Sequence, residues 1–236
     1  MNLLSLVQKC CQRINLPTPA TVYGSTDAQI LQMMGLLEEE VTDLASRPTW
    51  QSLQREASHT TLALEDQGDI NTLFPGFSFY RNETMWDTTD SLPVIGPLSG
   101  SDWQEIKSVF ANGPRYQFRF RGNHLLVNPI PTAGHAWKFE YESRYAILDV
   151  DGTTLKEFFS ADTDTFILPD NLLLMGLRWR WMREKGLDYG ELFATYERQV
   201  KIAMGNDGGA LTLSIEGGAP TKAPGVFVPV SNWVVP

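Results

Sequence analysis

The stretch from Leu168 to Asp207 constrains the fold most, because its apolar pattern is helical and almost continuous. Pro169 and Asp170 suit a helix start, since the missing proline N–H would be unpaired there and aspartate caps free amides. Lys185 and Gly186 suit a helix end. Apolar residues recur at spacings of three and four in two stripes, which are Leu172, Met175, Trp179 and Met182, and Leu174, Leu177 and Trp181. The spacing predicts a helix over 170–185 near the centre of a core.

A second helix is predicted over 189–205. Its apolar face consists of Tyr189, Leu192, Phe193, Tyr196, Val200, Ala203 and Met204. The link from Gly186 to Asp188 is short, so the two helices must lie antiparallel as a hairpin. The hairpin carries no catalytic group and is interpreted as a packing platform.

Two amphipathic helices are predicted near the N-terminus, over 2–15 and 26–46. Pro17 and Pro19 end the first, and Thr26 with Gln29 matches a capping box at the start of the second. Arg47 marks the end of the second helix. The simplest arrangement joins these helices to the later hairpin in one bundle.

The middle of the chain reads as β-rich. Rings at Tyr116, Phe118 and Phe120 alternate with polar side chains, and Gly122-Asn123 is a two-residue hairpin turn. Residues 58–65 and 137–145 also alternate. We expect 116–121, a returning strand with Leu125 and Val127, and 137–145 to form an antiparallel three-stranded meander.

The sequence therefore predicts an α+β fold. Its predicted parts are a bundle of terminal helices over 1–49 and 166–207, an inserted antiparallel β-rich region over 50–165, and an extended C-terminal arm over 208–236. The last 20 residues hold a single charge, Lys222, and four prolines, which exclude a helix. Seven apolar residues lie among them: Val226, Phe227, Val228, Val230, Trp233, Val234 and Val235. We expect this arm to dock into a partner subunit, the alternative being a disordered tail.

Charge and cysteine content narrow the classes of function. A net charge of −9 argues against broad affinity for nucleic acid or anionic membranes. No apolar run approaches the roughly 20 residues of a membrane helix. Cys10 and Cys11 are adjacent and give no disulfide framework, which favours a reducing compartment and a mature cytosolic N-terminus.

No metal, cofactor or catalytic site is predicted. His59, His124 and His135 are scattered, and no G-x-S-x-G, P-loop or G-x-G-x-x-G sequence occurs. Asp149 and Asp151 begin like a calcium loop but lack its later ligands, so a turn is predicted there. Asp162 and Asp164 are likewise interpreted as turn residues.

Arginines interleaved with rings over 115–121 are also typical of nucleic-acid platforms. Strand alternation, however, places rings and guanidinium groups on opposite faces. We expect the arginines to pair with Glu140 and Glu142 on a neighbouring strand.

Several ordered stretches together resemble the head-to-tail adaptor proteins of short-tailed bacteriophages, also called connectors or tail tubular proteins. They span about 1–207 and are Leu44–Trp50, Pro97-Leu98 before Ser101-Asp-Trp103, Arg121-Gly-Asn123, Asn128-Pro129, Phe139-Glu-Tyr141, Phe166–Pro169, Leu177–Trp181 and Lys185–Asp188. The resemblance implies a virion structural protein without enzymatic activity, made in the host cytoplasm. It implies a ring, usually of twelve copies, that lies under the portal protein, contacts nozzle or fibre proteins, and extends the DNA channel.

Acidic charge suits such a ring, because a channel wall that repels phosphate lets DNA slide. Twelve copies at −9 would carry roughly −108. We expect Glu38, Glu39 and Glu40 to face the channel.

Two other functions stay open at this point. One is a ligand- or carbohydrate-binding module that uses loop aromatics such as Trp86 and Trp103. The other is a hydrolase whose triad would join Ser101 to His124 or His135.

Overall fold

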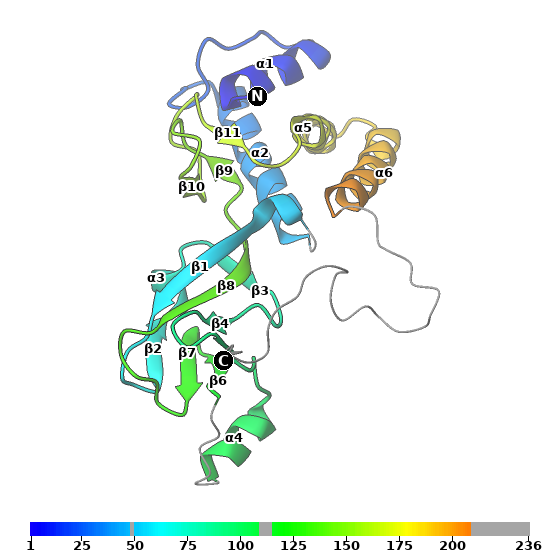
Figure 1. The fold of residues 1–236 in the computed structure, drawn as a ribbon. Coiled ribbons are helices and arrows are strands. Elements are labelled where there is room, and N and C mark those ends of the chain that lie inside the picture. The colour runs from blue at the N-terminus through cyan, green and yellow to red at the C-terminus, as the bar shows by residue number, and fades with distance from the viewer. Residues whose placement is uncertain (48–49, 109–114, 209–236) are drawn as a thin grey trace, which may run out of the picture.

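The computed structural model describes residues 1–47, 50–108 and 115–208. Its long helices gather at one end, and most strands lie at the other together with two short helices (Figure 1). The predicted α+β class is confirmed. The four long helices are α1 (Leu3–Arg13), α2 (Ala28–Ser46), α5 (Asp170–Glu184) and α6 (Gly190–Asp207). Three shorter ones are η1 (Gln51–Leu53), α3 (Ile70–Leu73) and α4 (Gly100–Ser108).

The strands form three antiparallel sheets. The largest has the order β1-β8-β4-β5, with β3 also paired to β8. Its strands are β1 (Gln54–Thr60), β3 (Phe77–Tyr80), β4 (Trp86–Asp87), β5 (Leu92–Pro93) and β8 (Ala136–Ser143). A second sheet joins β2 (Asp66–Asp69), β7 (His124–Asn128) and β6 (Gln117–Arg121). A third joins β10 (Leu155–Lys156), β9 (Ile147–Leu148) and β11 (Thr165–Phe166).

The predicted hairpin of β6 and β7 is confirmed, but the predicted meander is wrong. Strand β8 does not continue that hairpin; it pairs with β1 over seven residues, from Gln54 opposite Glu142 to Thr60 opposite Ala136. The hairpin pairs with β2 instead. Glu140 and Glu142 therefore lie in a different sheet from the arginines of β6, and the predicted pairing between them is wrong.

Two local predictions are also corrected. The N-cap of α2 is Asp27, whose carboxylate accepts from the Gln29 backbone N–H at 2.8 Å, and not Thr26. The strand predicted over 58–65 begins earlier, at Gln54, and ends at Thr60. Leu62 and Leu64, predicted to lie on one strand face, are exposed in the loop that follows.

Two hydrophobic cores hold the described residues together. The first joins α1, α2, α5 and α6, and α5 lies at its centre with both apolar stripes contributing buried residues, as predicted. Ala146, Ile147 and Phe159 belong to this core, although they fall within the region predicted as the insert. The second core lies among the strands and is rich in rings, including Phe118, Trp137 and Phe139. The domain boundaries stay a prediction.

A buried polar network fixes three helices of the first core. Glu40 of α2 is fully buried, and its carboxylate accepts from Tyr196 Oη of α6 at 2.5 Å and from Arg180 Nε of α5 at 2.7 Å. Arg180 also reaches Glu39 and Asp43 of α2. Burial raises the pKa of Glu40, and the hydrogen bonds from Tyr196 and Arg180 oppose that shift.

Gly176 of α5 leaves the space that this carboxylate occupies, since a Cβ there would overlap Glu40 Oε1. We predict that Gly176→Ala lowers the free energy of unfolding by about 2–3 kcal/mol, because the overlap must be relieved by moving a packed helix. Chemical denaturation monitored by tryptophan fluorescence measures this.

Gly35→Ala in α2 is the matched control. A Cβ at Gly35 meets nothing within 4 Å, so this change should raise the free energy of unfolding by about 0.5–1 kcal/mol through helix propensity alone. Equal effects of the two substitutions would contradict the close packing at Gly176.

Candidate functional sites

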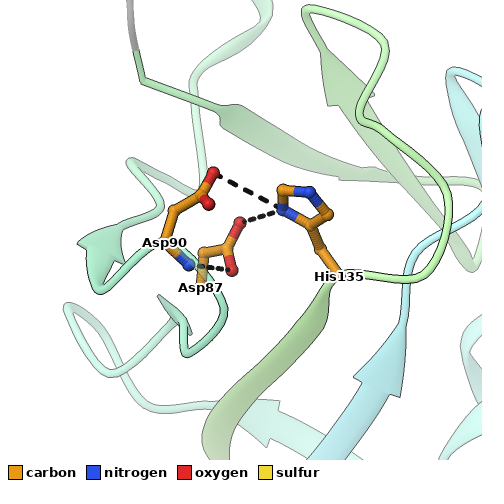
Figure 2. A group of neighbouring side chains, drawn as sticks. All are labelled: Asp87, Asp90 and His135. Atoms are coloured by element: carbon orange, nitrogen blue, oxygen red, sulfur yellow. Dashed lines mark hydrogen bonds and ion pairs between the residues drawn. The ribbon is translucent and has the colours of Figure 1, made fainter.

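Three side chains from two distant parts of the chain meet where the β4–β5 hairpin reaches the start of β8 (Figure 2). The Nδ1 atom of His135 lies 2.8 Å from Oδ2 of Asp87 and 3.6 Å from Oδ2 of Asp90. The other Asp87 oxygen, Oδ1, accepts from the backbone N–H of Thr89 at 2.9 Å and of Asp90 at 3.2 Å. Asp87 is thereby placed by the turn that it caps, and His135 by the strand that follows it.

Electrostatics couple the members of this Asp87–Asp90–His135 cluster. The hydrogen bond to Asp87 raises the pKa of His135, and both carboxylates add attraction for the imidazolium. Burial alone would raise the pKa of Asp87, but hydrogen bonds from His135 and from the Asp90 and Thr89 amides outweigh burial and lower it.

In chemical terms the cluster is a hydrogen-bonded clip. The ligand atoms of Asp87, Asp90 and His135 all lie within 4.8 Å of one another, close enough to share a metal ion. Among the described residues, this is the group of His, Cys, Asp and Glu side chains with that spacing. Asp87 already accepts three hydrogen bonds, which account for its burial without a metal. Thr88 adds hydrogen bonds from its N–H and hydroxyl to the Ala136 carbonyl, so the clip ties the hairpin to β8.

A larger feature is a cleft of about 530 Å³ beside β3 and the turn between β6 and β7. Its walls include the aromatic residues Phe77, Phe79, Tyr80 and Phe120, the guanidinium groups of Arg121 and Arg144, and the amides of Asn71, Asn82 and Asn123. No acidic residue lines it. No sequence pattern indicates this cleft, since its walls come from separate elements that only the sheet topology brings together.

The three acidic residues predicted to face the channel differ in their exposure. Glu38 is half-buried and Glu39 is exposed on α2, so the prediction that they face a channel stays a prediction. Glu40 is 0% exposed within a single chain and bound to Arg180 and Tyr196, so its assignment to a channel wall is wrong. The seven apolar residues of the predicted arm, Val226 to Val235, lie outside the described residues.

The structure also limits the rival sites. Trp103 is 0% exposed and cannot present its ring to a sugar, whereas Trp86 is partly exposed. The Ser101 hydroxyl pairs with Ser99 Oγ at 2.9 Å. Within the described residues, His124 bonds to Asp66 and His135 to Asp87, and no serine hydroxyl reaches either ring.

The aspartates predicted to form turns do so. Asp151 accepts from the backbone amides and hydroxyls of Thr153 and Thr154, which lower its pKa. Asp162 accepts from the Val22 and Tyr23 amides and ties the α1–α2 connection to the loop before β11. Asp164, fully buried, accepts from Lys156 Nζ at 2.7 Å.

Comparison with known proteins gives the class. A family model described as SU10 adaptor protein matches residues 1–211. This match identifies the chain as a structural protein of bacteriophages. The chain belongs to the SU10 adaptor protein family, a family of phage head-to-tail adaptors.

Membership bears out part of the sequence-based hypothesis. The chain is a virion component with partners at the head–tail junction. A search of curated proteins finds no match.

Among the described residues, no helix is both long and apolar enough to cross a membrane. Cys10 and Cys11 are buried free thiols.

The clip makes a prediction about pH. The raised pKa of His135 means that its ionic contribution to stability is complete below about pH 6.5, the unfolded histidine pKa, and is lost as pH rises through the folded value. The lowered pKa of Asp87 gives a contribution that is present above about pH 4 and is lost as pH falls through the folded value. The clip should therefore stabilise most between about pH 4 and 6.5.

His135→Asn tests this, because the asparagine amide replaces the Nδ1–H donor without the titration. We expect the difference in Tm between the wild-type protein and this variant to be largest near pH 5.5 and to shrink toward pH 9. His124→Asn is the control, since the His124–Asp66 pair is exposed on both sides. A difference for His135→Asn that does not change with pH would contradict the ionic clip.

Proposed function

We propose that the protein forms a ring of about twelve copies under the portal, where it extends the DNA channel and links the capsid to the tail. Membership of the SU10 adaptor family over residues 1–211 carries this proposal. The ring would be built by one chain contacting the next, and its role would be mechanical, with no reaction catalysed.

The surface of the helical end supports contact with neighbours. Leu187 and Tyr189 in the hairpin link, and Phe193 and Ile202 on α6, are large apolar side chains left exposed in a single chain. Phe193 packs one edge against Trp179 at a ring distance of 5.0 Å, so its position is fixed while its outer face stays open. Exposed apolar side chains of this kind suit a protein–protein contact.

The residues after Asp207 would provide the link to the portal. Their apolar and proline-rich composition suits an extended segment that gains its order by docking. The acidic balance of the chain suits a channel through which DNA passes without specific binding. Glu38 and Glu39 are retained as candidates for that wall, and Glu40 is not.

Mass photometry of the protein mixed with its portal ring tests the proposal. The full-length chain should add about a dozen subunits to the portal, and a chain ending at Gly217 should add none. Because truncation removes 19 residues, a full-length variant with Phe227→Ser and Trp233→Ser should fail in the same way.

Thr221→Ser with Ser231→Ala is the matched control in the same segment and should bind like the wild-type protein. Binding that survives both truncation and the double serine variant would move the docking surface to the helices. No binding by the full-length chain would reject the adaptor role.

A further inference from the structure

We propose that the cleft beside β3 receives an exposed acidic loop, residues 149–158, from a second copy of this chain. The proposal rests on the proposed ring, because it names surfaces through which one copy would contact the next. It follows from three observations: the charge of the cleft, the composition of the loop, and the attachment of each to a different core.

The cleft is cationic in an acidic protein. The chain has 28 acidic and 19 basic side chains, yet the cleft holds Arg121, Arg144 and no carboxylate. Neither guanidinium forms an ion pair with a described residue; Arg144 lies 5.5 Å from the ring centre of Tyr145. Both side chains are exposed and keep their donors available for a carboxylate.

Beside the arginines the cleft is aromatic. The ring of Phe77 lies 5.5 Å from Tyr141 and 5.6 Å from Phe120, so these rings form a packed wall. Phe79 stands at the edge and is largely exposed. Such a cleft fits a segment that carries a carboxylate next to a large apolar side chain.

The chain displays such a segment. In the loop, Val150 is 73% exposed and Phe158 is 61% exposed, which places both among the most exposed large apolar side chains of the described residues. Glu157, next to Phe158, is exposed and forms no ion pair with any described residue. The one cation of the loop, Lys156, is bound to Asp149 and Asp164, so the outward charge is negative.

The loop is also held in shape before it meets a partner. Four hydrogen bonds from Thr153 and Thr154 to Asp151 close its tip. At its end Phe159 is buried and packs edge-on against Phe166 at 5.6 Å. A preformed loop loses less conformational entropy on docking.

The contact would join two copies. The loop is anchored in the helical core through Ile147 and Phe159, whereas Phe77 and Phe120 of the cleft pack against the second core. No residue of the loop lines the cleft of its own chain, and Figure 1 shows β9 and β10 beside the helices, away from the β6–β7 hairpin. Contact between two different surfaces is head-to-tail, the geometry that closes into rings.

Disulfide trapping on the full chain tests the contact. Because both native cysteines are buried, any cross-link comes from the introduced cysteines. A mixture of Phe158→Cys and Ser78→Cys proteins should give a cross-linked dimer under mild oxidation, at least tenfold more than Phe158→Cys mixed with Leu64→Cys. Leu64 is 59% exposed and lies outside the cleft, so it is a matched control. Equal yields from the two mixtures would overturn the proposal.

Charge reversal separates this inference from the proposed function. Arg121→Glu with Arg144→Glu should weaken self-association at least tenfold, and Glu157→Lys should weaken it as well. Mixing the two variants should restore association. The unchanged loop of one variant meets the unchanged cleft of the other, and the reversed charges of the altered loop and the altered cleft also attract each other. Lys107→Glu with Arg115→Glu makes the same charge change outside the cleft and should have no such effect.

The outcomes are distinct. Normal ring formation on the portal by the Arg121→Glu, Arg144→Glu variant would overturn the cleft contact and leave the adaptor role standing. Loss of the ring with that variant, together with specific trapping, would support both. Failure of the wild-type protein to associate either alone or on the portal, together with no specific trapping between the Phe158→Cys and Ser78→Cys proteins, would reject both.

Discussion

The helical end of the molecule depends on one buried carboxylate. Glu40 enters a core made of leucine, methionine and tryptophan, where an unpaired charge would be prohibitively costly. Arg180 and Tyr196 satisfy it from two other helices, and Gly176 leaves room for it. Removing one partner of a buried pair typically costs about 3–5 kcal/mol, so the network fixes which faces of α2, α5 and α6 meet. Arg47 extends the same contact by bonding Glu197 of α6 at 2.8 Å.

That arrangement positions the surfaces that we propose for assembly. The C-terminal end of α2 leads through η1 into β1, and β1 pairs with β8 over seven residues within the largest sheet (Figure 1). The loop over 149–158 is held to the helical end, because Ile147 and Phe159 on its flanks belong to the helical core. Leu3 N–H and Leu4 N–H bind carbonyls at Asp164 and Asp162, which fastens the loop region to the first helix. A ring subunit needs this rigidity, because small errors in the angle between copies prevent closure.

Sequence reasoning succeeded where the structure is local. Helices with long apolar stripes and the Gly122-Asn123 turn were predictable, because the periodicity and the turn chemistry reside in adjacent residues. The partner of β8 was not, since β1 lies about 80 residues earlier and nothing local encodes that pairing. The role of Glu40 had a signal: it lies at helical spacing on the stripe of Leu37 and Leu44, so a charged residue there indicated a buried pair. The cleft and the Asp87–Asp90–His135 cluster had none, because both arise only when separate loops meet.

A single-particle cryo-EM reconstruction of the full-length protein bound to its portal ring tests the adaptor role most directly. We expect a closed ring of about a dozen copies, with density for the residues after Asp207 on the portal and Glu40 buried inside each copy. Discrete single copies, or a two-fold dimer related by identical surfaces, would contradict it.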